Sequence, residues 1–242
     1  MKIRSVNKDD FKTTRWSGGT TTEFFIYPPG ADYQKRMFAA RISSAVIEDE
    51  YSKFTELPGV TRYLALLSGE TDLVANGEKI VLDPYEIVKF SGTDVVESYG
   101  TCRDFNLMLK GVNGSMDCVR VGNIQTDFYI PCNMMVVIYN CSDDNISITG
   151  GTSNQGTSSD QSISSSESMS SDQGISSSES MSSDQGISLS KSISPSHNIS
   201  PGALAVLSTE NEKNEEIIKI SSDVKGSELS SLLVCEFEVC GS

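Results

Sequence analysis

The sequence predicts an all-β protein built from small jelly-roll barrels, and three features of its 242 residues support this. Short segments rich in β-branched and aromatic residues alternate in hydropathy, as half-buried strands do. Glycine and proline turns separate these segments at intervals of about 8–12 residues, a spacing typical of sandwiches and barrels. Helical patterns are scarce, and only the stretch "KDDF" favours a short helical turn.

The clearest strands lie in residues 1–110. The stretch "TTTEFFIYPP" ends at a Pro-Pro-Gly turn, and "MFAARISSAVI" alternates between an apolar and a polar face. The pair Asn76-Gly77 predicts a type I′ hairpin, because both central residues of that turn need positive φ. The remaining strands expected in this block are "RYLALLSGE", "TDLVANGEKIVL", "DPYEIVKFSG" and "CRDFNLMLKG".

A second block, residues 111–242, repeats the pattern more weakly around an insert at 151–198. The insert carries three copies of a twelve-residue serine-rich repeat beginning "SSDQSISSSESM". Each copy has too few apolar residues to offset the entropy of ordering it, about 1–2 kcal/mol per backbone residue, so we expect disorder there. A stacked β arrangement of its Ile and Met residues is the alternative. The expected strands of this block are "NMMVVIYNC", "NISITGG", "SPGALAVLST", "EEIIKIS" and "SLLVCEFEV".

Composition excludes several classes of function. The net charge of −14 disfavours nucleic acid and anionic membrane as partners. No apolar stretch resembles a signal peptide or a membrane span, so we expect a cytoplasmic protein whose six cysteines are free thiols. The single histidine, His197, lies in a polar tract. We therefore expect no metal, no other cofactor and no Ser-His-Asp triad.

Strand alternation predicts a polar group inside the first barrel. In the first strand Thr21, Glu23 and Phe25 share one face, and Arg41 on the next strand is the natural partner of Glu23. An isolated buried charge costs several kcal/mol, so the two must pair if both are buried. An ordinary structural or solvent-facing pair is the alternative.

Three further positions complete the candidate set. Asp104 and Asn106 share a face of "CRDFNLMLKG" opposite Phe105 and Leu107, a spacing that suits two groups aimed at a ligand, although an outward polar face gives the same pattern. Arg62 follows a Pro-Gly turn, where its planar fork could hold a carboxylate at a barrel mouth. Trp16, the only tryptophan, is a candidate pocket wall or plain packing. The Gly-Gly-Thr stretch after it lacks the lysine and helix of a phosphate loop.

The stretches "RWSGGTTTEFFIYPPGADY", "ARISSA", "F-x-x-LPGVTRYLALLSGE" and "DFNLM" together resemble the HutD/Ves family, densely over residues 1–110 and thinly afterwards. Many relatives open with W-x-N-G-G-G-T-T-R-E; this chain is two residues shorter and has threonine in place of the arginine. The resemblance implies a cupin-like double-stranded β-helix fold in a bicupin-like arrangement, without the usual metal ligands. It further implies a small-molecule-binding or regulatory protein of histidine utilisation or stress response.

We therefore expect a metal-free protein that binds a small polar or carboxylate metabolite, such as a formylglutamate- or urocanate-like acid. Arg41 or Arg62 would hold the carboxylate, Glu23 and Asn106 would hydrogen-bond polar atoms, and Trp16 and Phe25 would form apolar walls. Two alternatives stay open. One is a cofactor-free isomerase or epimerase with Glu23 or Asp104 as base and Tyr63 or Tyr85 as acid, and the other is a scaffold acting through the serine-rich loop. A homodimer through exposed strands stays open as well.

Overall fold

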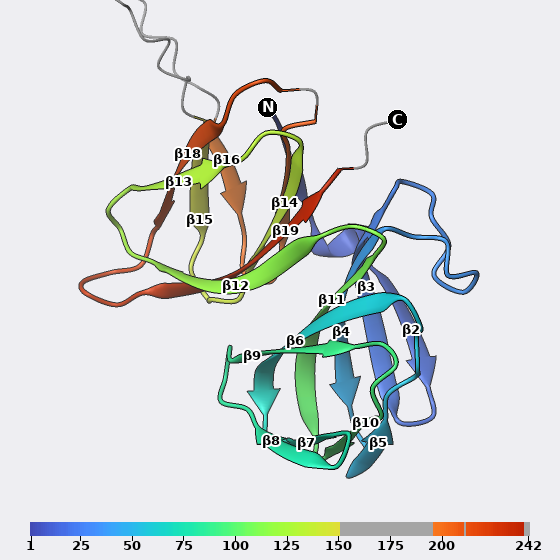
Figure 1. Cartoon of the computed structure of the whole chain (residues 1–242). Coiled ribbons are helices and arrows are strands. Elements are labelled where there is room, and N and C mark those ends of the chain that lie inside the picture. The colour runs from blue at the N-terminus through green and yellow to red at the C-terminus, as the bar shows by residue number, and fades with distance from the viewer. Residues whose placement is uncertain (151–195, 211, 240–242) are drawn as a thin grey trace, which may run out of the picture. The chain divides into compact units, whose positions relative to one another are not determined.

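The computed structural model describes residues 1–150, 196–210 and 212–239, all within one compact unit formed by Met1–Ser153 and Pro195–Ser242 (Figure 1). The predicted disordered insert, 151–198, therefore lies outside the described residues except at its end. There the prediction is corrected, because residues 196–198 begin a strand, Ser196–Ile199, that pairs with Ile146–Gly150.

The described residues form four antiparallel sheets, two in each half of the unit. The six-stranded sheet, in spatial order, contains β2 (Lys12–Trp16), β3 (Gly19–Tyr27), β4 (Ala40–Ile47), β11 (Cys102–Lys110), β6 (Val60–Gly69) and β9 (Ile87–Ser91). Its four-stranded companion contains β5 (Tyr51–Lys53), β10 (Val96–Tyr99), β7 (Asp72–Ala75) and β8 (Glu78–Val81). The five-stranded sheet contains β1 (Lys2–Val6), β17 (Leu204–Ser208), β14 (Met134–Asn140), β19 (Ser230–Glu238) and β12 (Gly114–Val121). The last sheet contains β13 (Thr126–Ile130), β18 (Glu216–Ser222), β15 (Ile146–Gly150) and β16 (Ser196–Ile199).

The all-β, cupin-like prediction is confirmed by this architecture. The only helical element in the described residues is the short 3-10 turn Lys8–Asp10, where "KDDF" predicted one. The predicted hairpin is also present: Asn76 (φ 50°) and Gly77 (φ 87°) connect β7 to β8. The N-terminal strand departs from the expected boundary at residue 110, because β1 pairs with β17 and so completes a sheet of the second half.

The six-stranded sheet and the five-stranded sheet pack face to face through a shared apolar core. Phe105 and Leu107 of β11 and Ala40 and Ile42 of β4 supply one side of this core, and Phe237 of β19 is part of the other. The opposite face of the six-stranded sheet covers the four-stranded sheet β5-β10-β7-β8 through a smaller apolar cluster. The opposite face of the five-stranded sheet covers the remaining sheet. The result is two barrels joined through their larger sheets.

The interiors of the two barrels differ in chemistry. Fourteen buried residues, all aliphatic, fill the second barrel, among them Ile130, Ile138, Ile146 and Ile218. In the first barrel, apolar packing covers only part of the sheet, and buried polar residues occupy the rest. A ligand site in the described residues is therefore to be sought in the first barrel.

Candidate functional site

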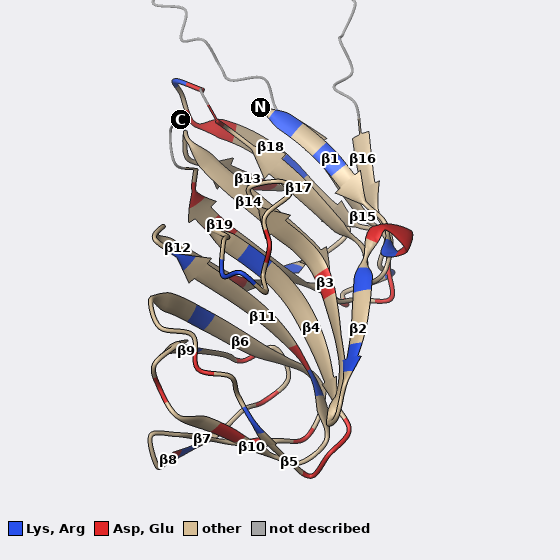
Figure 2. Cartoon of the chain, turned by 90° about the vertical axis from the view of Figure 1, so that its right-hand side faces the viewer, with Lys and Arg blue, Asp and Glu red and all other residues tan. Residues whose placement is uncertain are grey.

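A cavity of about 610 Å³ opens in the first barrel, which is the size of pocket that holds a small ligand. The inner faces of β3, β4, β6 and β11 form its floor, the edge strand β2 and the segment after β3 form one side, and β5 with the residues after it forms another. Figure 2 shows charged positions on several of these strands, including basic ones along β2.

The floor follows directly from strand alternation. On β11 the odd residues Phe105 and Leu107 enter the core shared by the barrels, so Asp104 and Asn106 face the cavity. On β4 the same rule sends Ile42 to the shared core. The polar faces predicted from sequence for these two strands are therefore inward faces.

A β-bulge in β3 separates Glu23 from Phe25. The register with β4 runs from Glu23 opposite Ser43 directly to Phe25 opposite Ile42, which leaves Phe24 as the extra residue. Glu23 accordingly faces the cavity, whereas Phe25 turns to the shared core and packs 6.3 Å, centroid to centroid, from Phe237. The expectation of Phe25 as a pocket wall is corrected, because strict alternation does not survive the bulge.

Glu23 and Arg41 form an ion pair within the cavity. Nε of Arg41 donates to Oε2 of Glu23 over 2.8 Å, and Nη1 of Arg41 donates to Ser43 over 3.0 Å. The Arg41 guanidinium also lies 4.1 Å from the ring centre of Tyr33. Arg41 is thus neutralised and held in place by neighbours on three sides.

Arg62 is the opposite case. Its side chain is buried, and its guanidinium lies 4.9 Å from the ring centre of Phe54 and 5.0 Å from that of Phe90. Among the described residues, no carboxylate lies within salt-bridge distance of Arg62, and its buried Nε has no hydrogen-bond partner. Burial lowers the pKa of Arg62 to about 10, although Asp104 opposes the shift. Arg62 therefore remains a cation at neutral pH, held by aromatic rings instead of a counter-ion.

Asn106 presents a second unsatisfied group. Its Oδ1 is buried and accepts no hydrogen bond. Asn106 sits opposite Leu64 on β6, diagonally across from Arg62, which pairs with Met108. Buried polar atoms in folded proteins almost always have hydrogen-bond partners. Two unsatisfied atoms on the floor of one cavity, Nε of Arg62 and Oδ1 of Asn106, therefore indicate a place where a ligand or water completes the hydrogen bonding.

Asp104 lies on the same floor and is 3% exposed. The backbone N–H of Ala45 donates to Oδ1 over 2.8 Å, whereas no described residue donates to Oδ2. Burial raises the pKa of Asp104 to about 6, against the opposing effects of the Ala45 amide, Arg62 and Arg103. The carboxyl group therefore changes charge close to neutral pH.

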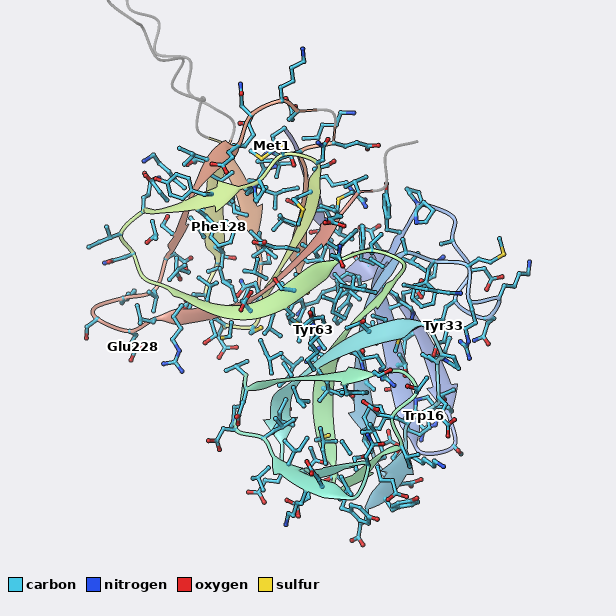
Figure 3. All side chains as sticks on the ribbon, viewed as in Figure 1. Met1, Trp16, Tyr33, Tyr63, Phe128 and Glu228 are labelled. Carbon is cyan, nitrogen blue, oxygen red and sulfur yellow. The ribbon has the colours of Figure 1, made fainter. Side chains whose placement is uncertain are left out.

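Trp16 and Thr21 come from the hairpin that joins β2 to β3. Indole Nε1 of Trp16, which is labelled in Figure 3, donates to Oγ1 of Thr21 over 3.1 Å, and both residues line the cavity. The tryptophan ring also covers Gly18, because a Cβ there would lie 2.4 Å from a ring carbon. Thr22, where the family pattern has arginine, does not line the cavity and bonds Thr13 across the hairpin.

Several lining residues were missed from sequence. Tyr33, which covers Arg41, lies in the quoted opening stretch, but nothing in its local pattern ties it to a distant strand. Phe54 and Phe90, which flank Arg62, are far apart in sequence and meet only through the pairing of the sheets. Lys12 of β2 and Lys53 of β5 also line the cavity and form no ion pair with the described residues.

Two features of the described residues concern other chemistries. No group of three or more His, Cys, Asp or Glu side chains in this part of the chain is arranged to hold a metal ion. Tyr63 and Tyr85, the acids of the isomerase hypothesis, do not line the cavity, and Tyr63 instead donates to the carbonyl of Gly114 across the two barrels (Figure 3). The five cysteines within the described ranges are free thiols.

Comparison with known families supplies an assignment. The model of the HutD family matches residues 8–181, more than half of the chain. The chain belongs to the HutD family. A comparison of this HutD-family sequence with curated proteins found no match.

Solved structures show the same fold at low identity. The conserved protein of unknown function PA5104 from Pseudomonas aeruginosa PAO1 aligns with a TM-score of 0.67 at 17% identity, covering 99% of this chain and 100% of that one. HutD from Pseudomonas fluorescens SBW25 aligns with a TM-score of 0.64 at 16% identity, covering 98% and 100%. The bacterial pirin YhhW from Escherichia coli aligns with 0.56 at 11% identity, covering 98% and 99%. This HutD-family chain is therefore a cupin-like protein. No helix in its described ranges has the length and hydropathy needed to cross a membrane.

Proposed function

We propose that this HutD-family protein binds a small carboxylate metabolite in the cavity of its first barrel, without a metal, and acts as a sensor or regulator. The observation that supports this best is Arg62, a buried cation with no counter-ion, on the floor of a cavity large enough for a ligand. A buried charge without a partner is expensive, and a carboxylate bound by the guanidinium fork would satisfy it.

The neighbouring groups suit such a ligand. Asn106 offers an amide beside the anion site, Trp16 offers an apolar surface at the open side, and Glu23 is available to accept a hydrogen bond while it remains paired with Arg41. Because Arg41 already has its carboxylate, Arg62 is the better of the two arginines to hold the ligand.

The family assignment suggests the first ligands to test. The resemblance to the HutD/Ves family implies a link to histidine utilisation, so N-formyl-L-glutamate and urocanate are the leading candidates. Trp16 is the only tryptophan and lines the cavity, so its fluorescence provides a direct binding signal.

The experiment is a fluorescence and thermal-shift titration with both acids. We expect saturable binding by the wild type and its loss in Arg62→Gln. The matched control is Arg120→Gln, which removes an exposed arginine outside the cavity lining and should leave binding intact. If neither acid, nor acetate at high concentration, changes either signal, the carboxylate proposal is wrong.

The isomerase alternative is weaker on this geometry. Glu23 is bound to Arg41, and neither proposed tyrosine lines the cavity. Asp104 lines the cavity without an ion pair to a described residue, so it is the remaining candidate base. Incubating candidate acids with the protein in D₂O tests this alternative, because an isomerase working through proton abstraction would exchange a carbon-bound hydrogen for deuterium.

A further inference from the structure

The charges inside the cavity are balanced before any ligand binds. Arg41 and Arg62 contribute two positive charges, and Glu23 and Asp104 contribute two negative charges when both are ionised. The other charged lining residues are closer to solvent: Lys12, Arg15 and Lys53 are exposed, so water screens them, and the partly exposed Asp32 is paired with Lys35. A bound carboxylate would therefore leave this buried set with one excess negative charge, a state that low-dielectric surroundings disfavour.

Protonation of one of the two carboxylates would remove the excess negative charge, and the two differ in their contacts. Glu23 already accepts a charge-assisted hydrogen bond from Arg41 at 2.8 Å. In the described part of the chain, Asp104 has no cation within salt-bridge distance, and only its Oδ1 accepts a hydrogen bond, from the Ala45 N–H. Asp104 is the group that can take a proton with least loss.

The surroundings of Asp104 favour the same outcome. Burial raises its pKa to about 6, and Arg62 on β6 and Arg103 on β11 are the cations that oppose this shift. The neighbouring thiol of Cys102 is uncharged at neutral pH, because burial raises its pKa to about 11. A ligand carboxylate on Arg62 would offset the cation that most favours ionised Asp104, so binding and protonation should reinforce each other.

We propose that the cavity takes up one proton together with its anionic ligand, and that this proton resides on Oδ2 of Asp104, which then donates a hydrogen bond to the ligand carboxylate. The inference rests on the proposed function and assigns Asp104 as the residue that makes binding depend on pH. The proton comes from solvent, and the O–H bond on Asp104 is the only covalent bond formed. The ligand carboxylate would then be held by Arg62 on one side and by a neutral carboxyl group on the other.

Two consequences distinguish this arrangement from simple binding to a cation. Affinity for a carboxylate should fall about tenfold per pH unit once the pH exceeds about 6.5, although the ligand itself stays ionised. Near pH 7, binding should also take up close to one proton per ligand, about 0.5–0.9 on average.

Titration calorimetry of the wild-type full chain tests both. Acetate is the first probe, because it carries one carboxylate and no other charge, and N-formyl-L-glutamate is the second. The enthalpy is measured in two buffers of different ionisation enthalpy, neither a carboxylate nor a phosphate, and Trp16 fluorescence gives the affinity between about pH 5.5 and 8.5. A binding enthalpy that differs between buffers, with a falling affinity, supports proton uptake.

Two variants test which carboxylate takes up the proton. Asp104→Asn keeps an oxygen for the Ala45 N–H and supplies a neutral donor in place of Oδ2–H, so it should bind acetate without proton uptake or pH dependence. Glu23→Gln removes the other carboxylate of the same cavity and should keep the proton uptake, whatever its affinity. Loss of uptake in Glu23→Gln with retention in Asp104→Asn would overturn the assignment.

Wild type and Arg62→Gln together separate the two proposals. If acetate or formylglutamate binds in an Arg62-dependent manner with no buffer dependence and no fall in affinity, proton uptake is wrong and the carboxylate site stands. If neither probe binds wild type at any pH, the proposed function fails and this inference fails with it.

Discussion

Arg41 and Arg62 line the same cavity, yet only Arg41 is paired, with its Nε 2.8 Å from Oε2 of Glu23. Arg62 instead has its guanidinium group against the rings of Phe54 and Phe90, and it lines the cavity. The first arrangement stabilises the floor of the barrel, and the second maintains an unneutralised charge. A protein optimised for stability alone would not keep the second.

Replacing Arg62 should separate stability from binding. Burial lowers the pKa of Arg62 from 12.5 to about 10, so the side chain stays charged at neutral pH, and this buried charge destabilises the folded state. In Arg62→Met we expect complete loss of carboxylate binding, with an unfolding free energy that is unchanged or higher by up to about 2 kcal/mol. Urea denaturation and Trp16 fluorescence measure the two quantities. A stability loss above about 2 kcal/mol would show that Arg62 is structural.

Asp104 should destabilise the fold at neutral and alkaline pH. Its pKa rises from 3.8 to about 6 on folding, so the protonated group contributes stability below pH 3.8 that is lost as the pH rises through about 6. Asp104→Asn is neutral throughout and should raise the unfolding free energy at pH 8 by about 1–3 kcal/mol. Denaturation at pH 4 and pH 8 checks this, and an equal gain at both would contradict it.

Gly19 should be intolerant of any side chain. Its φ is 152°, and a Cβ would lie 1.9 Å from the carbonyl oxygen of Val46 on the neighbouring strand. We expect Gly19→Ala to cost more than about 3 kcal/mol, because backbone must move. Gly77→Ala is the control: it has positive φ but nothing within 4 Å, so about 1 kcal/mol is expected. Similar losses in both variants would show that crowding at Gly19 is unimportant.

The sequence predicted the floor of the site because period-two alternation holds on β4 and β11. Arg41, Asp104 and Asn106 line the cavity, on the face opposite Ile42 and Phe105, although the pattern alone also allowed an outward polar face. The prediction failed where alternation is interrupted or where contacts are distant.

Phe25 shows the first kind of failure. One extra residue in β3, Phe24, reverses the side chains from Phe25 onward, and a bulge has no sequence signature in this segment. Strands β12 and β13 show a related gap, because their alternation is too weak to predict a strand. Phe54 and Phe90, the aromatic pair around Arg62, show the second kind of failure, because strands far apart in sequence must pair before these two rings meet. The placement of β1 in the second barrel likewise depends on a partner some 200 residues away in sequence.

Phe25 and Trp16 should therefore respond differently to truncation. Phe25 is buried in the core between the barrels, so Phe25→Ala should cost about 3–5 kcal/mol and leave the affinity for acetate unchanged. Trp16 is 37% exposed beside the cavity, so Trp16→Ala should cost less than about 1.5 kcal/mol and weaken binding of N-formyl-L-glutamate. Calorimetric binding and urea denaturation measure both variants. The reverse pattern would restore Phe25 as a pocket wall.

The insert should be dispensable for the fold, because its flanking strands already meet. Thr149 of β15 pairs directly with Ser196 of β16, so a tight hairpin turn can replace residues 150–195. With Asn-Gly in that place, we expect a melting temperature within a few degrees of wild type and unchanged acetate binding, since the cavity lies in the other barrel. Thermal melts and calorimetry check this. A folded, ligand-binding variant that fails to restore function in its host would favour the scaffold alternative, in which the serine-rich segment contacts a partner.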